Sequence, residues 1–222
     1  MQDLIKQEQF ELELLDRLNS KKMLSSLVLG GGTMLRLCFG LERFSVDLDF
    51  WVVKKINYNK LYTDLTSFLS GPYIIKDRAN KFHTFLFELK SKDYPRSLKI
   101  EIRKEPKKIK IETAIAYSRY SNLQVFLQAV SLEDMMREKV ATFLKRKEVR
   151  DVFDIEFLFK RGMSLDFSAD VLKKLLREID SLSKRDYAVK LGSLLEEKHR
   201  KYYSSQNFKI LKSAILERLN SS

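Results

Sequence analysis

Residues 30–50 read GGGTMLRLCFGLERFSVDLDF and contain the pattern with the clearest chemical meaning. Asp47 and Asp49 are separated by one residue within segment 46–53, whose alternating apolar side chains predict a strand. Alternate residues of a strand share a face, so both carboxylates are expected on the face opposite the apolar side chains. Two carboxylates about 6–7 Å apart at their Cβ atoms repel each other. A hard cation such as Mg²⁺ between them would remove that penalty.

The glycines before the aspartates predict a phosphate site. Gly30 to Gly32 follow a short apolar run at 27–29, which predicts a strand, and precede a helix predicted at 33–39. This arrangement places free backbone N–H groups at a helix N-terminus, where phosphate binds. Thr33 and Ser45 add hydroxyl groups. A glycine-rich turn alone often marks only a tight turn, and a lone Asp-x-Asp is often a solvated strand face. Together on strand, turn, helix and strand, the two motifs predict a phosphate-and-metal site.

These residues resemble the nucleotidyltransferase superfamily, which has a DNA polymerase β-like palm. Residues 31–50, GGTMLRLCFGLERFSVDLDF, resemble more narrowly the opening motif of the AbiEii/AbiGii family, the toxin components of bacterial abortive-infection and type IV toxin–antitoxin systems. The resemblance implies a nucleotidyltransferase fold with an extra helical domain, NTP as substrate and dependence on Mg²⁺ at a two-metal site. Some family members transfer nucleotides to the acceptor end of tRNA.

The resemblance also implies roles for individual residues. Asp47 and Asp49 would hold the metal ions. The residues expected to bind the nucleotide are Gly31, Gly32, Thr33, Arg43 and Ser45.

The superfamily pattern includes a third carboxylate on a later strand. The strand predicted at 97–103 places Glu101 opposite Ile100 and Ile102, which are expected to face the core. Glutamate stands here where related enzymes commonly have aspartate, which keeps the charge and lengthens the reach. We therefore predict Glu101 as a third catalytic and metal-binding residue. The alternative is an exposed Lys–Glu–Arg strand face.

A second segment, EKVATFLKRKEVRDVFDIEFL at 138–158, resembles the family's downstream signature. Lys139 lies on the helix predicted at 132–146, on a face that it shares with apolar side chains. A partly buried lysine needs an anion, and a nucleotide triphosphate would serve. The resemblance therefore makes Lys139 both a catalytic and a nucleotide-binding candidate.

The next predicted helix, at 150–160, carries Asp151 and Asp154 on one face. Asp151 could accept a proton from an attacking hydroxyl or orient Lys139. The structural alternative is an ordinary ion pair between Arg150 and Asp154, with Asp151 favoured in the first turn by the helix dipole. The family match favours function for Asp151 more than for Asp154.

Charge points to a polyanionic partner. The 222 residues carry a net charge of +12, with 44% apolar and 32% charged residues. A Lys-rich proteome would give the same excess. Basic residues cluster on both sides of the predicted site, at Lys99, Arg103, Lys104, Lys107, Lys108 and Lys110, and at Arg137, Lys139, Lys145, Arg146, Lys147 and Arg150. The candidates for contact with RNA or phosphate are Arg103, Arg146 and Arg150. Four tyrosines are further candidates for stacking on bases: Tyr117, Tyr120, Tyr202 and Tyr203.

The remaining composition predicts a cytoplasmic protein. The single cysteine, Cys38, excludes an internal disulfide, and two distant histidines argue against zinc. We expect neither a signal peptide nor a membrane span.

The predicted fold class is α/β (α+β), with a mixed nucleotidyltransferase-type sheet and flanking helices in residues 1–130. A helical domain at 131–222 is expected to contribute Lys139 and Asp151 to the site. Beyond the helices given above, the predicted helices are 3–18, 58–69, 169–178, 184–202 and 208–219. The further predicted strands are 74–76 and 84–89, and 107–128 is ambiguous.

The sequence thus predicts an enzyme that transfers a nucleotide from an NTP to an acceptor hydroxyl. The acceptor is expected to be RNA, at the tRNA 3′ end, and the protein the toxin of a system whose cognate antitoxin is encoded nearby. Two alternatives stay open. One is a nucleotide- or RNA-binding protein of the same fold without transfer activity, against which the intact carboxylates argue. The other is nucleotidylation of a small molecule or a protein.

Overall fold

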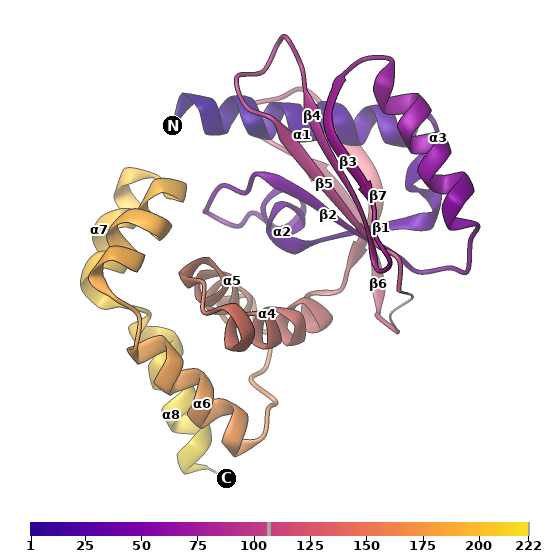
Figure 1. Cartoon of the computed structure of the whole chain (residues 1–222). Coiled ribbons are helices and arrows are strands. Elements are labelled where there is room, and N and C mark those ends of the chain that lie inside the picture. Colours follow the sequence, from indigo (N-terminus) through magenta and orange to yellow (C-terminus); the bar gives the residue numbers. More distant parts are fainter. Residues whose placement is uncertain (106–107, 222) are drawn as a thin grey trace. The chain divides into compact units, whose positions relative to one another are not determined.

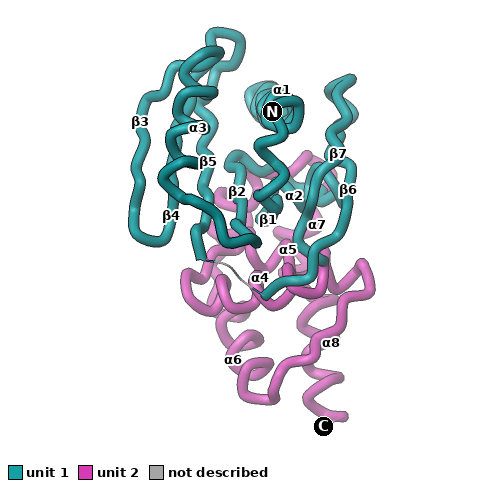
Figure 2. The backbone as a smooth tube through the Cα atoms, turned by 90° about the vertical axis from the view of Figure 1, so that its right-hand side faces the viewer, with its two compact units in different colours: residues 1–131 teal, residues 132–222 magenta. Residues whose placement is uncertain are grey.

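The chain divides into two compact units, residues 1–131 and 132–222 (Figure 2, teal and magenta). The computed structural model describes residues 1–105 and 108–221, so Lys107 of the first basic cluster lies outside the described residues. The first unit holds a mixed sheet with helices and the second is helical. The predicted α/β class is therefore confirmed.

The described strands form one seven-stranded sheet in the order β3-β4-β5-β2-β1-β7-β6 (Figure 1). β1 and β7 run parallel, as do β2 and β5, and the other neighbours are antiparallel. The bounds are β1 Leu27–Gly30, β2 Asp47–Val52, β3 Ile74–Asn80, β4 Thr84–Lys90, β5 Leu98–Arg103, β6 Ile111–Tyr117 and β7 Gln124–Val130. The ambiguous stretch at 107–128 thus contains β6 and most of β7.

The described residues of the first unit include three α-helices: α1 Gln2–Ser20, α2 Gly31–Phe39 and α3 Tyr58–Ser70. A 3-10 turn, Met23–Ser26, leads from α1 into β1. The Asn57 side chain accepts a hydrogen bond from the Lys60 N–H at 3.0 Å and so caps the start of α3.

One face of the sheet forms the core of this unit. Leu48 and Phe50 are buried, and the parallel register places them beside the buried Ile100 and Ile102. Aromatic packing between α3 and β4 covers the same face further along the sheet. Alternation along β2 therefore turns its two aspartates to the opposite face, as predicted.

The second unit consists of helices. Their bounds are α4 Leu132–Arg146, α5 Val149–Lys160, α6 Ala169–Asp180, α7 Glu197–Gln206 and α8 Lys209–Asn220. Buried leucine and isoleucine side chains of α6 and α8 form part of its core. Among the described residues, none of the helices has the length and apolar character needed to cross a membrane.

The prediction of a single helix at 184–202 is wrong. A π-helical segment, Asp186–Leu191, and a 3-10 turn, Gly192–Leu194, occupy its first half, and Leu195 is extended. Ser183 and Asp186 hydrogen-bond reciprocally through side chain and backbone, which is a capping box that starts this segment where the helix was predicted to begin. Gly192 then weakens the helix, because glycine has low helix propensity.

Glu11 of α1 is an acidic group buried inside the first unit, with a side chain 1% exposed. Burial, followed by the negative charges of Glu8 and Asp47, raises the pKa of this carboxyl well above its usual value of 4.5, and Arg36 opposes the shift. Above pH 4.5 the unfolded chain therefore releases a proton that the folded chain holds. Stability contributed by the neutral form is lost as pH rises towards the folded-state pKa.

We predict that Glu11→Gln, which cannot ionise, unfolds at a higher temperature than the wild type at pH 8. The difference should shrink as pH falls to 4.5. Thermal unfolding measured across this range tests the prediction. A wild type that gains stability relative to the variant as pH rises would contradict it.

Candidate nucleotidyltransferase site

The turn between β1 and α2 brings a carboxylate against the start of a helix. Gly30 pairs with Asp49 across β1 and β2, and Gly31 begins α2 with φ of 72°. A Cβ atom on Gly31 would lie 2.3 Å from Oδ2 of Asp49. Only glycine therefore satisfies both the backbone conformation and this close approach.

The next glycine accommodates a cation and a hydroxyl. A Cβ atom on Gly32 would lie 2.5 Å from Nη2 of Arg43 and 2.9 Å from Oγ of Ser45. Arg43 is buried and donates from Nη1 to the Phe44 carbonyl at 3.0 Å. The guanidinium thus lies beside the positive end of the α2 dipole, an arrangement that suits an anionic ligand. The structure brings together four predicted residues here, Gly31, Gly32, Arg43 and Ser45.

Thr33 has a role that the sequence did not suggest. Its side chain is fully buried, and Oγ1 donates to the backbone carbonyl of Asp47 at 2.7 Å. The single hydroxyl hydrogen is therefore used to hold the start of β2 against α2. In this conformation the hydroxyl has no hydrogen left to donate to a phosphate, so the predicted hydroxyl contact is not available.

Glu101 lies beside the aspartates. The parallel register of β2 and β5 pairs Asp49 with Glu101 and Asp47 with Lys99, so the three carboxylates share one face of the sheet. Arg103, two residues further along β5, places Nε 3.7 Å from Oε1 of Glu101, and both side chains are about two-fifths exposed.

The carboxylates fit a divalent cation by donor type and by shared face. In residues 1–105 and 108–221, no three or more acidic, histidine or cysteine side chains are gathered closely enough to hold a metal ion by themselves. Protein sites for Mg²⁺ commonly use one or two carboxylates and complete their coordination with water and substrate phosphate. Asp47 and Asp49 match that donor set.

In the second unit, Lys139 is held by aspartates of the following helix. Its Nζ lies 2.6 Å from Oδ2 of Asp154 and 3.5 Å from Oδ1 of Asp151. Both aspartates are fully buried, and Lys139 is 7% exposed. Lys139 therefore belongs to a buried ion pair between α4 and α5, and Asp154 has a direct structural role there.

Asp151 also binds Arg146 through two hydrogen bonds. Nε and Nη2 of Arg146 lie 2.6 Å and 2.7 Å from the two carboxylate oxygens. This bidentate geometry fixes both side chains. Of the two roles considered for Asp151, these contacts favour orienting Lys139. Arg150 lies one residue before Asp151, and its Nε is buried without a hydrogen-bond partner.

Residues 13–216 match the family profile described as "Nucleotidyl transferase AbiEii toxin, Type IV TA system". The match spans most of the chain and both signature segments. The chain belongs to the AbiEii family. It is accordingly a nucleotidyltransferase of a toxin family, and membership implies a nucleotide substrate and a cognate antitoxin.

Solved structures from Helicobacter pylori share the fold of this AbiEii protein. The crystal structure of JHP933 is 23% identical, with a TM-score of 0.56, and the match covers 96% of this chain and 95% of that one. A candidate nucleotidyltransferase from H. pylori is 24% identical, with a TM-score of 0.58 and 96% of each chain covered. No curated protein matches the sequence.

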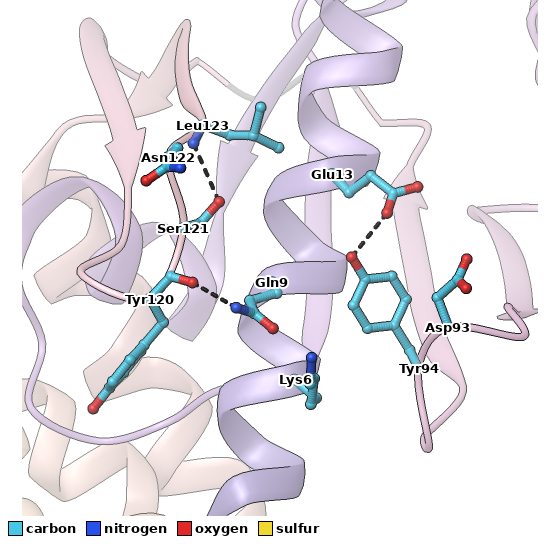
Figure 3. A pocket seen from close by; sticks show the side chains of 9 residues that line it. All are labelled: Lys6, Gln9, Glu13, Asp93, Tyr94, Tyr120, Ser121, Asn122 and Leu123. Atoms are coloured by element: carbon cyan, nitrogen blue, oxygen red, sulfur yellow. Dashed lines mark hydrogen bonds between the residues drawn. The ribbon is translucent and has the colours of Figure 1, made fainter.

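A pocket of about 390 Å³ on α1 was not anticipated from the sequence (Figure 3). Its walls include Glu13, which accepts a hydrogen bond from the Tyr94 hydroxyl at 2.8 Å, and Gln9, whose Nε2 donates to the Tyr120 carbonyl at 2.5 Å. The lining residues come from α1 and from two loops far apart in sequence, which is why no local motif indicates the pocket.

Replacing Gly31 by alanine should displace Asp49 and abolish nucleotide transfer. The added Cβ would overlap the Asp49 carboxylate, and the positive φ would cost about 1–2 kcal/mol. Gly162→Ala is the matched control, because Gly162 also has a positive φ, of 87°, with open space around it. In thermal unfolding, Gly162→Ala should lose about that much stability and keep transfer, whereas Gly31→Ala should lose more stability, because the overlap adds to the backbone cost, and should also lose transfer. Equal activity of the two variants would contradict the role given to the Gly31–Asp49 contact.

Lys139→Met should destabilise the protein by roughly 3–5 kcal/mol, because it removes the ammonium group that lies 2.6 Å from a carboxylate oxygen of the fully buried Asp154. Adding Asp154→Leu should restore much of that loss. Denaturant unfolding measures both changes.

Lys160→Met is the control for this prediction. Lys160 also pairs with a buried acid of α5, Glu156, at 2.7 Å. Glu156 keeps hydrogen bonds from the Tyr203 hydroxyl and the Leu211 N–H, so the loss should stay near 1 kcal/mol. A Lys139→Met variant as stable as the wild type would mean that only the hydrocarbon part of the Lys139 side chain contributes to stability and that its ion pair with Asp154 does not.

Proposed function

We propose that this enzyme transfers a nucleotide from an NTP to a hydroxyl of an RNA acceptor, the 3′ end of tRNA, and acts as a toxin by doing so. The observation that carries the proposal is the placement of Asp49 at the start of α2, with Glu101 beside it and Arg43 at the next glycine. That arrangement puts carboxylates next to helix N–H groups and a guanidinium, which supports adjacent binding of a metal ion and of phosphate.

In the reaction, the acceptor hydroxyl oxygen bonds to the α-phosphorus and its proton passes to water. The bond from the α-phosphorus to the oxygen shared with the β-phosphate breaks, and that oxygen leaves with its electron pair as part of pyrophosphate. Asp47, Asp49 and Glu101 are the proposed metal ligands. Two bound Mg²⁺ ions would supply positive charge to the attacking and the leaving oxygen. The backbone N–H groups at Gly31 and Gly32, with Arg43 and Ser45, are proposed to hold the terminal phosphates.

In the helical unit, Lys139 is proposed to offset negative charge on the triphosphate. The family match, which includes the segment at 138–158, supports this role. Arg146 and Arg150 are proposed to contact RNA or phosphate, as is Arg103 of the first unit.

An exposed face of the β6–β7 hairpin supports an RNA acceptor. Phe126 is 65% exposed and Tyr117 55% exposed, and Ile115 pairs with Phe126. Ala129 pairs with Leu29, and Leu29 pairs with Phe50, so these three side chains lie on one side of the sheet. Because side chains alternate along a strand, Phe126 lies on the other side, together with Asp49. Exposed aromatic rings on a sheet can stack on unpaired bases, and the net charge of +12 favours a phosphate backbone.

Asp47→Asn should abolish transfer, because it keeps the shape of the side chain and removes the charge that a cation needs. We expect a loss greater than the roughly 100-fold that substitution of an outer-shell residue produces. Asp93→Asn, an exposed aspartate at the α1 pocket, is the control and should retain activity. The measurement is incorporation of label from each NTP, with Mg²⁺ and total RNA.

Growth of a bacterial host expressing each form tests the toxin role. The wild type and Asp93→Asn should slow growth, and Asp47→Asn should not. Label on protein or on a small molecule in place of RNA would overturn the acceptor assignment. Nucleotide binding by the wild type without any transfer would favour the binding-protein alternative.

A further inference from the structure

Helix α1 buries three polar side chains on one face. Gln7, Glu8 and Glu11 are 0%, 3% and 1% exposed. Burying polar groups is unfavourable unless they form hydrogen bonds. Glu8 has such partners, since it accepts hydrogen bonds from Arg36 and from the Ser118 hydroxyl. Gln7, in contrast, donates hydrogen bonds from its side-chain amide to backbone carbonyls.

The Gln7 side chain bridges two neighbouring strands. Its Nε2 lies 3.2 Å from the carbonyl oxygen of Val46 and 3.4 Å from that of Ser97. Val46 directly precedes Asp47 at the start of β2, and Ser97 directly precedes β5. One NH₂ group thus donates its two hydrogens to both strands.

These contacts lie at the starts of β2 and β5, next to the strand residues that carry the carboxylates. The parallel pairing of β2 with β5 starts at Asp47 and Lys99 and continues to Asp49 and Glu101. The Gln7 amide thus connects the two strands just before their parallel pairing begins. The distance between the two strands at this point sets how far Asp47 and Asp49 lie from Glu101.

We propose that Gln7 is a positioning residue that fixes β2 against β5 and thereby holds Asp47 and Asp49 at the correct distance from Glu101 for metal binding. The inference rests on the proposed function, in which these carboxylates bind divalent cations. Gln7 contacts two backbone carbonyls and is not among the proposed metal or nucleotide ligands. Supporting groups of this kind matter because a displacement of about 1 Å at a reacting site can lower the rate about 100-fold.

The neutrality of the amide suits this place. The buried Oε1 atoms of Gln7 and Glu11, one helical turn apart, both have no hydrogen-bond partner. The amide of Gln7 carries no charge, so position 7 adds no negative charge behind the aspartates. A carboxylate at position 7 would add such charge and would face two carbonyl oxygens without a hydrogen to donate.

The test compares Gln7→Met with Gln9→Met in the full-length protein. Methionine keeps the length of glutamine and removes the amide. Gln9 is on the same helix and also donates its amide to a backbone carbonyl, that of Tyr120 at the pocket wall (Figure 3). The readouts are the dissociation constant for Mn²⁺, kcat and KM for nucleotide transfer, and the unfolding temperature.

We expect Gln7→Met to weaken Mn²⁺ binding or to lower kcat by 10- to 100-fold, with KM for the NTP within about threefold of the wild type. Gln9→Met should change neither quantity. If both variants lose stability and both keep Mn²⁺ binding and kcat within about threefold of the wild type, Gln7 serves only the fold and the inference is wrong.

Two further results keep the inference separate from the proposed function. If the wild type transfers no nucleotide but Gln7→Met still weakens Mn²⁺ binding, the proposed function fails and the positioning role stands. If Gln7→Met does not fold, Gln7→Asn replaces it. Asparagine keeps the amide on a shorter stem and cannot reach both carbonyls, so unchanged Mn²⁺ affinity in Gln7→Asn would overturn the inference.

Discussion

The contact between the Asp49 carboxylate and the backbone of Gly31 is the constraint on which the site depends. It requires a residue without a Cβ atom, a positive φ at the first residue of α2, and the pairing of Gly30 with Asp49. Thr33 fixes the same corner by bonding the Asp47 carbonyl. The sheet register then places Glu101 beside Asp49. Three glycines and two close carboxylates, unfavourable when considered singly, are thus parts of one arrangement.

The helical unit contains a second group of carboxylates, which are paired with cations of the protein itself. Lys139 and Arg146 neutralise the buried Asp151 and Asp154, so these aspartates stabilise α4 against α5 at the same time as they orient the cations. Buried ion pairs are weak contributors to net stability, but removing one partner is strongly destabilising. Loss of activity on substitution of Lys139 alone would therefore not separate chemistry from folding, which is why the double variant is needed.

Local patterns predicted the parts of the site that lie close together in sequence. The alternation in β2 placed its aspartates on one face, and the helix at 132–146 was predicted at its observed bounds. Long-range contacts were not predictable in the same way. The pairing of Asp49 with Glu101, the carbonyl contact of Thr33 and the strand bridge of Gln7 depend on strand register, which no local pattern specifies. The break within 184–202 lies at Gly192 and the extended Leu195, where the low helix propensity of one glycine interrupts an otherwise helical pattern.

The central claim is that the two carboxylates of β2, Asp47 and Asp49, repel each other when no cation is bound and together bind a divalent cation. Thermal unfolding of the wild type and of Asp49→Asn, each in EDTA and in excess Mg²⁺, tests it most directly. A ligand that binds only the folded state raises the unfolding temperature. We predict that Mg²⁺ stabilises the wild type and not Asp49→Asn, and that Asp49→Asn is at least as stable as the wild type in EDTA. An equal rise with Mg²⁺ in both proteins would contradict the assignment of a metal site to these carboxylates.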